Sequence, residues 1–172
     1  MKRAFRTSLF LLAALLLLTA CAAVFASAAD AAVYYYIDSE RGADNVSGRN
    51  PEKPLRTWSE ACKNAVRDGA RRAYIVMMNA YVFDGNASEI EHPDVEFVLT
   101  TRGETTDYGA SGAKMVISGG RRYYLGGATV FEHLTIERDN SLVVVAQYHP
   151  LTFGEGMTMT YTSATARGLR VV

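Results

Sequence analysis

Residues 129–161 read TVFEHLTIERDNSLVVVAQYHPLTFGEGMTMTY, and this stretch decides the predicted fold class. Short apolar runs alternate there with turn residues, among them Asp139-Asn140 and Gly154-Glu155-Gly156. The runs predict strands because β-branched and aromatic side chains fit a pleated surface, whereas Gly, Asp and Asn fit turns. The same alternation begins after Gly69 and continues to Val172, so we predict an all-β fold class for this region.

Apolar residues at the centres of four predicted strands are almost evenly spaced. Phe97, Ile117, Ile136 and Met157 are separated by 20, 19 and 21 residues. A period of about 20 residues with strands and sharp turns is typical of a solenoid coil. A β-sandwich repeats its strands every ~8–12 residues, and two such steps give the same interval. The spacing alone therefore leaves both architectures open.

The segment before Gly69 has a different pattern. Residues 33–37 are β-branched and aromatic, which predicts a strand, and residues 38–54 form a loop rich in Gly, Asp, Asn, Ser and Pro. Thr57 and Glu60 have the spacing of a capping box at the start of a helix. Residues at helical spacing follow: Trp58, Ala61, Ala65 and Val66. We expect a short amphipathic helix that ends near Gly69.

This segment resembles the opening of right-handed parallel β-helix proteins of the pectin-lyase-like superfamily. The motifs are YYID at 35–38, GAD at 42–44, SG at 47–48, NP at 50–51, KPLRTW at 53–58 and EA at 60–61. Further on, residues 131–136 and 151–159 resemble coils of the same class, as found in large surface proteins of Gram-positive anaerobes.

The resemblance implies a right-handed parallel β-helix, a solenoid, with a short N-terminal capping helix. Residues 33–68 would form the first strand, loop and capping helix, with Trp58 as the plug, and residues 69–172 would form the coils. The chain stops at Leu169 to Val172, which reads as an unprotected strand. We therefore expect the coils to be incomplete and the chain to be the N-terminal part of a longer protein.

The first 28 residues have the order of a secretory signal peptide. Lys2, Arg3 and Arg6 precede an apolar run from Leu9 to Leu18, and small residues follow. Cleavage after Ala28 fits the Ala-Ser-Ala sequence at 26–28. Leu-Thr-Ala-Cys at 18–21 resembles a lipobox, so the alternative is cleavage before Cys21 with a lipid on that residue. A third interpretation is an uncleaved anchor, because the apolar run to Ala29 approaches the ~20 residues that span a bilayer.

Composition excludes some partners. The chain has 172 residues, with 18 basic and 18 acidic side chains, so its formal net charge is +0 and nothing indicates nucleic-acid binding. Beyond the signal peptide Cys62 is the only cysteine, so no internal disulfide can form there and we expect a buried structural thiol. Contact with a membrane is predicted only through the signal peptide or a lipid on Cys21.

No residue is predicted to be catalytic or to bind a cofactor. The ionisable residues considered for polysaccharide cleavage are Asp107, Glu132, Glu137, Arg138 and Asp139, and the last three are more simply a solvated turn. Asp38 and Asp44 are weak candidates for Ca²⁺, but Asx turns explain them without a metal. Three isolated histidines, His92, His133 and His149, give no zinc motif. Arg121 to Tyr124 could stack on sugars, but an exposed turn explains them equally.

These observations predict an extracytoplasmic protein, secreted or at the cell surface. The expected function is a non-catalytic β-helix module, adhesin-like or envelope-associated, with polysaccharide or the cell envelope as its partner. One alternative is the N-terminal part of a polysaccharide lyase or glycoside hydrolase with a pectin-lyase-like fold. Another is a small sandwich carbohydrate-binding domain.

Overall fold

The computed structural model describes residues 32–83, 94–117, 122–124, 127–138, 142–145, 149–162 and 169–171. All of them belong to one compact unit, Ala32–Val172. Several sequence predictions lie outside the described residues: the signal peptide at 1–28, Cys21, His92, Arg121 and Asp139. None of the helices in the described part of the chain is long and apolar enough to cross a membrane.

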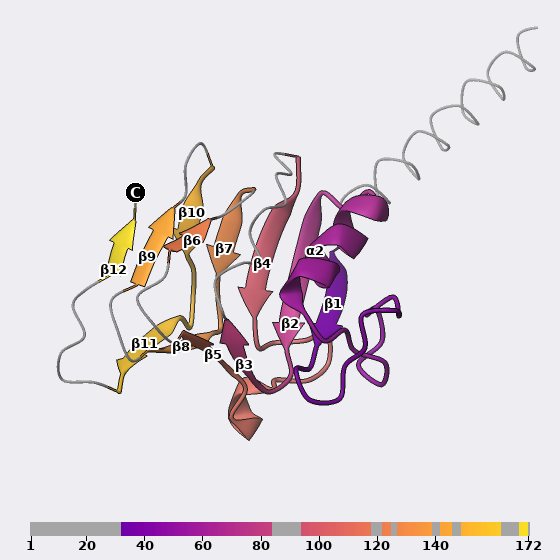
Figure 1. The fold of residues 1–172 in the computed structure, drawn as a ribbon, viewed down its shortest axis with the longest axis horizontal. Coiled ribbons are helices and arrows are strands. Elements are labelled where there is room, and N and C mark those ends of the chain that lie inside the picture. The colour runs from indigo at the N-terminus through magenta and orange to yellow at the C-terminus, as the bar shows by residue number, and fades with distance from the viewer. Residues whose placement is uncertain are drawn as a thin grey trace, which may run out of the picture. The chain divides into compact units, whose positions relative to one another are not determined.

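The described strands form three parallel sheets (Figure 1). The first sheet has the order β1-β2-β4-β7-β10, with β1 at Val33–Ile37, β2 at Arg72–Met77, β4 at Glu96–Thr100, β7 at Thr129–Phe131 and β10 at Leu151–Phe153. The second has the order β11-β8-β5-β3, with β3 at Ala80–Phe83, β5 at Lys114–Ile117, β8 at Thr135–Arg138 and β11 at Thr158–Tyr161. The third has the order β12-β9-β6, with β6 at Arg122–Tyr124, β9 at Leu142–Val145 and β12 at Leu169–Val171.

The strands lie close to where the sequence predicts them, because each coincides with a run of β-branched or aromatic residues between turns. Two runs are divided. The run 73–83 gives β2 and β3, and the run 129–136 gives β7 and the first half of β8, with a sharp turn at His133, which has φ 45°. A non-glycine residue with positive φ is strained, so neighbouring hydrogen bonds have to hold it.

The predicted helix is confirmed as α2, Trp58–Arg67. Thr57 is its N-cap, and the Thr57 hydroxyl accepts the backbone N–H of Glu60 at 3.3 Å. The Thr57 N–H is bound by Asp44 Oδ1 at 3.0 Å, a partner from the preceding loop. Gly69 follows the helix in the left-handed region, with φ 70°, which favours glycine.

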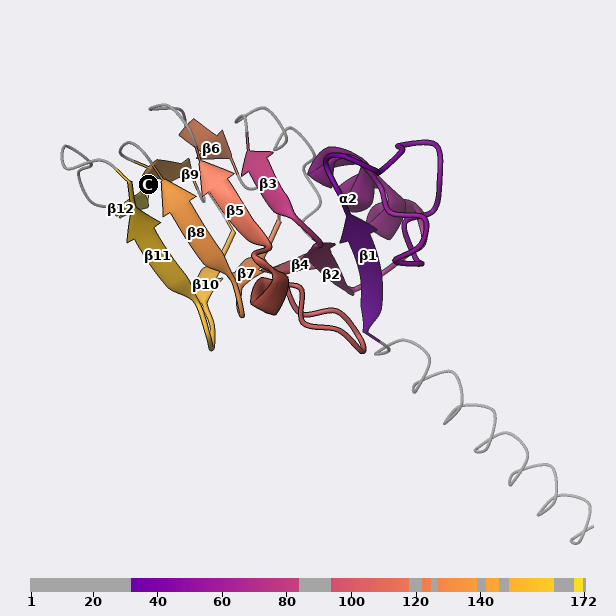
Figure 2. The same cartoon turned by 90° about the horizontal axis from the view of Figure 1, so that it is seen from below.

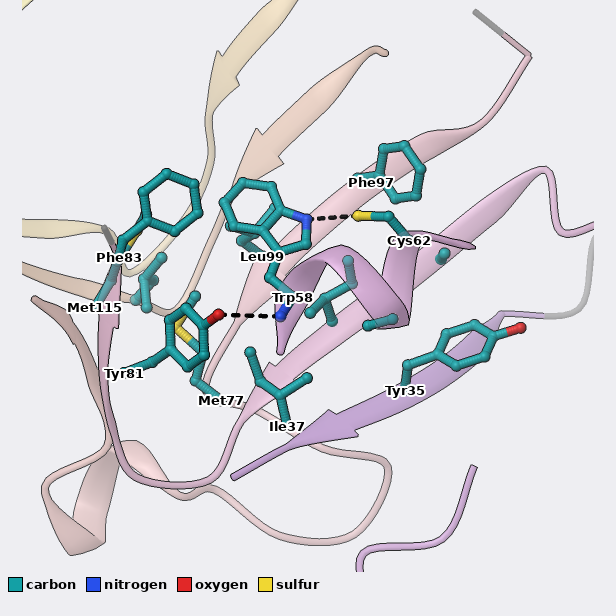
Figure 3. Close-up of a cluster of buried hydrophobic side chains, with 14 of the residues drawn as sticks. Tyr35, Ile37, Trp58, Cys62, Met77, Tyr81, Phe83, Phe97, Leu99 and Met115 are labelled. Carbon is teal, nitrogen blue, oxygen red and sulfur yellow. Dashed lines mark hydrogen bonds between the residues drawn. The ribbon is translucent and has the colours of Figure 1, made fainter. Parts of the chain in front are cut away.

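One hydrophobic core lies between the helix and the inner faces of the sheets (Figure 3). Trp58 sits at its centre: the indole ring lies 4.5 Å from the Phe83 ring, and its N–H donates to Cys62 Sγ at 2.5 Å. The backbone N–H of Trp58 donates to Tyr81 Oη at 3.0 Å. The helix is thus joined to both the first sheet, through its contacts with β1 and β2, and the second sheet.

The predicted all-β solenoid is wrong: the fold class is mixed α/β, with flat, open parallel sheets and one α-helix, and the sheets do not close into a solenoid. A helix that the resemblance treats as an accessory cap supplies Trp58, Ala61, Cys62 and Ala65 to the core. The ladders between the described strands are all parallel, which equally departs from the hairpins of a sandwich.

The even spacing in the sequence does not correspond to strand pairing. Phe97 lies in the first sheet, whereas Ile117 and Ile136 lie in the second and are not paired with each other. Met115 pairs with Ile136 and Ile117 pairs with Arg138. The near-equal intervals therefore combine residues of different sheets.

Residues 101–113, which we call the outer segment, connect β4 to β5 and fold back over the outer face of the first sheet. Tyr36 alternates along β1 with the core residues Tyr35 and Ile37, so its ring lies on that outer face. The ring meets Tyr108 edge to face at 6.3 Å, and Tyr36 Oη accepts the backbone N–H of Glu104 at 3.3 Å. Figure 2 shows this segment below the strands, extending from the short 3₁₀ helix toward the foot of β1.

Candidate functional site

The outer face of the first sheet carries a pair of stacked tyrosines. Tyr34 on β1 is paired in register with Tyr74 on β2, and their rings are stacked with centroids 4.8 Å apart. Both are only half-buried. We call this pair the tyrosine platform.

The platform is held in place from the β2 side. The Arg72 guanidinium lies 5.4 Å from the centroid of the Tyr74 ring, and Arg72 Nε is 3.0 Å from Glu96 Oε2 on β4. Arg72 and Glu96 are also register partners, so a cross-strand ion pair fixes the cation over the ring. Tyr74 is therefore covered on two sides, and Tyr34, on the outermost strand of the sheet, is the ring that remains more available to a ligand.

The outer segment stands beside the platform and contributes a carboxylate. Burial raises the pKa of the Tyr34 hydroxyl, and Tyr74 and the charge of Glu104 raise it further, with smaller effects of Tyr36 and Glu132. Glu104 is exposed and Glu132 is half-buried. Two carboxylates thus lie close enough to Tyr34 to act on its phenol.

The charges around the platform are unevenly compensated. Arg72 pairs with Glu96, and Arg102 pairs with Asp107 at 4.0 Å. Glu104 and Glu132, by contrast, have no ion-pair partner within the described ranges. The uncompensated charge at this face is therefore negative, and both carboxylates can accept hydrogen bonds from a ligand.

The two weak Ca²⁺ candidates hold the loop that precedes the helix. Asp38 is 2% exposed; Oδ1 accepts the N–H groups of Glu40 and Arg41 and the amide of Asn79, and Oδ2 accepts Arg41 Nε at 2.7 Å. Burial alone would raise the pKa of Asp38, but these hydrogen bonds lower it below its usual value. Asp44 accepts Arg56 N, Thr57 N and Thr57 Oγ1.

The oxygens of Asp38 and Asp44 are thus engaged by N–H and O–H donors, as in Asx turns. A Cβ at Gly42 would overlap the Leu55 backbone oxygen, so this loop is also closely packed. Nowhere in the described ranges are three or more His, Cys, Asp or Glu side chains grouped to hold a metal ion.

The residues considered for polysaccharide cleavage are dispersed. Asp107 lies in the outer segment, where Oδ1 accepts the N–H of Gly109. Glu137 forms an ion pair with Lys114 at 2.6 Å, and the next residue, Arg138, is fully buried with its guanidinium 4.2 Å from the Tyr161 ring centroid. The interpretation of Glu137 and Arg138 as a solvated turn is wrong: both belong to β8, where consecutive side chains point to opposite faces.

His133 occupies a corner between the first and second sheets. Its carbonyl accepts Thr101 N at 3.2 Å and Thr101 Oγ1 at 2.7 Å, and its N–H donates to the carbonyl of Glu155 at 2.7 Å. A Cβ at Gly156, which has φ 66°, would lie 2.6 Å from His133 Nδ1. These contacts explain how the turn at His133 is maintained without assigning it a chemical role. His149 is half-buried, and the side chains of Arg122 to Tyr124 lie outside the described part.

Cys62 is buried, as expected, and burial raises the pKa of its thiol far above the usual range. A thiolate is therefore strongly disfavoured, which argues for a packing role.

Sequence reasoning missed the tyrosine platform. Tyr34 is part of the conspicuous run Tyr34-Tyr35-Tyr36, and the alternation of a strand indicates that its middle residue faces away from the other two. Tyr74 and Glu104 gave no comparable signal, because their proximity to Tyr34 depends on pairing across 40 residues and on the path of the outer segment. Comparisons with family models, curated proteins and solved structures find no match for this chain.

Proposed function

We propose that this chain is an exported, non-catalytic module, secreted or at the cell surface, that binds glycan in an adhesin-like or envelope-associated role. The observation that supports this most is the tyrosine platform: stacked, half-buried rings beside carboxylates without ion-pair partners. Aromatic faces pack against the C–H faces of sugar rings, and a few fixed polar groups orient such a ligand.

Export is supported by the order of residues 1–28, with a basic start, an apolar run and small residues. Mass spectrometry of the chain recovered from a bacterial host tests it. We expect either a new N-terminus at Ala29 or a lipid-modified Cys21, and the Cys21→Ala variant distinguishes the two. A product that retains residues 1–28 would contradict the proposal.

A binding role is favoured over turnover by the placement of the acidic and basic candidates. Glu137 is engaged by Lys114, Asp107 is engaged by Gly109 and Arg102, and Arg138 is in the interior. Glycoside hydrolysis needs two carboxyl groups facing the same bond, ~5–10 Å apart.

The test is a polysaccharide panel assayed in two ways on the purified chain. Affinity electrophoresis through gels that contain each polymer measures binding, and reducing-end release, with and without Ca²⁺, measures cleavage. We expect retardation in at least one gel and no release of reducing ends. Turnover would contradict the non-catalytic assignment and favour the lyase or hydrolase alternative, whereas unretarded migration in every gel would contradict glycan binding.

A further inference from the structure

We propose that the tyrosine platform binds neutral glycans and discriminates against acidic ones, with a sugar ring stacked on Tyr34 and its hydroxyls donating to Glu104 and Glu132. This inference rests on the proposed glycan-binding function and assigns the residues and the ligand class.

The geometry places an aromatic floor next to hydrogen-bond acceptors. Tyr34 lies on the outermost strand of the first sheet, supported from behind by Tyr74 at 4.8 Å. Arg72, held by Glu96, closes the Tyr74 side. A ring that is already supported in this way loses little side-chain freedom when a ligand stacks on it, which lowers the entropic cost of binding.

The acceptors are fixed by the backbone. The N–H of Glu104 donates to Tyr36 Oη, and the outer segment is closed by Gly103 N to Thr106 O at 2.8 Å and by Tyr108 N to Thr101 O at 2.9 Å. Glu132 follows β7 directly, and its N–H donates to the Leu99 carbonyl at 3.1 Å. Both carboxylates therefore project from ordered backbone, as an orienting group must.

Charge decides the ligand class. Glu104 and Glu132 have no cationic partner in the part of the chain that the structure describes, whereas Arg72 and Arg102 are each paired with a carboxylate. Sugar hydroxyls donate readily to carboxylates, and a hydrogen bond to an ionised acceptor is stronger than one to a neutral acceptor. A uronate carboxylate would instead meet like charge, which opposes binding.

The experiment compares the full chain with three single variants, in gels containing a neutral β-glucan, a neutral mannan or polygalacturonate. Tyr34→Ala removes the floor, Glu104→Gln removes one negative charge and keeps the shape, and Tyr161→Ala removes an exposed tyrosine of β11 as a matched control. Far-UV circular dichroism checks that each variant is folded.

We expect the parent chain to bind at least one neutral polymer at least tenfold more tightly than polygalacturonate. Tyr34→Ala should weaken that binding about tenfold, in line with the loss of an aromatic contact, and Glu104→Gln by several-fold. Tyr161→Ala should leave it unchanged.

Preferential binding of polygalacturonate would overturn the neutral class while leaving glycan binding intact. Neutral binding that Tyr34→Ala does not weaken would overturn the site assignment alone. Binding to none of the three polymers, if it extends to the whole panel, would contradict the proposed function as well.

Discussion

Asp38 offers the sharpest test of how the N-terminal loop is held. Its carboxylate accepts two backbone N–H groups, the Asn79 amide and Arg41 Nε while almost completely buried. Hydrogen bonds to a charged group contribute about 1.5–3 kcal/mol each, but they are not additive, and the exposed Glu40 and Arg41 can bind water instead. The ion pair adds little, since the Arg41 side chain is 72% exposed.

We therefore expect Asp38→Ala to lower the free energy of unfolding by about 3 kcal/mol at pH 7. Asp38→Asn keeps the Oδ1 acceptor and should cost about 1 kcal/mol. Urea denaturation followed by tryptophan fluorescence measures both, because the single Trp58 lies in the core that this loop adjoins. Equal stability of the parent chain and Asp38→Ala would contradict the assigned role.

The pH dependence has a definite sign. Because the folded-state pKa of Asp38 is lowered, its charge stabilises the fold fully above the unfolded-state value of about 3.9. That contribution is lost as the pH falls below this value and through the folded-state pKa. The difference between the parent chain and Asp38→Asn should thus be constant from pH 5 to 7 and shrink below pH 4. A difference that does not change with pH would refute the reasoning.

The same variants examine the weak Ca²⁺ hypothesis. With its oxygens engaged by N–H donors, Asp38 should give no Ca²⁺-dependent rise in the denaturation midpoint. A rise in the parent chain that is absent from Asp38→Asn would show instead that this carboxylate is available to the ion.

Other regions give independent predictions. Leu99→Ala, at a fully buried site, should lower the free energy of unfolding by about 2–5 kcal/mol, whereas Val82→Ala, where Val82 is 56% exposed, should change it by less than about 0.5 kcal/mol; thermal denaturation compares them. In a Cys21→Ala chain, Cys62 should react with a maleimide only after denaturation, and rapid labelling of the folded chain would contradict its burial. Thr160→Lys on the outermost strand β11 should reduce concentration-dependent self-association in analytical ultracentrifugation, since charge blocks edge pairing; a parent chain that is monomeric at all concentrations would refute this.

Local sequence signals predicted the positions of elements well because they act over a few residues. The helix is an example: the Thr57 cap, the apolar spacing and Gly69 all act within one segment, and the structure confirms the three together. The strand β1 is similarly specified by five consecutive β-branched and aromatic residues.

Pairing between strands could not be predicted because the connections differ in length. Along the first sheet Ala73 pairs with Phe97, and Phe97 pairs with Thr129, so successive steps cover 24 and 32 residues. The longer step contains the outer segment, whose ordering depends on contacts with Tyr36 on a distant strand. A search for one constant period cannot detect such steps, and this is why the spacing argument failed.

The core and the proposed site are linked through strand register. Tyr35 and Ile37 face the core on β1, and they are paired with Ile75 and Met77 on β2, which face the same core. Because side chains alternate, this inner pairing obliges Tyr34 and Tyr74 to meet on the outer face. A slip of one residue would expose the inner set and bury the platform. Core packing, together with the hydrogen bond from Tyr35 Oη to Asp68 of the helix end at 2.8 Å, therefore positions a surface site that no local motif encodes.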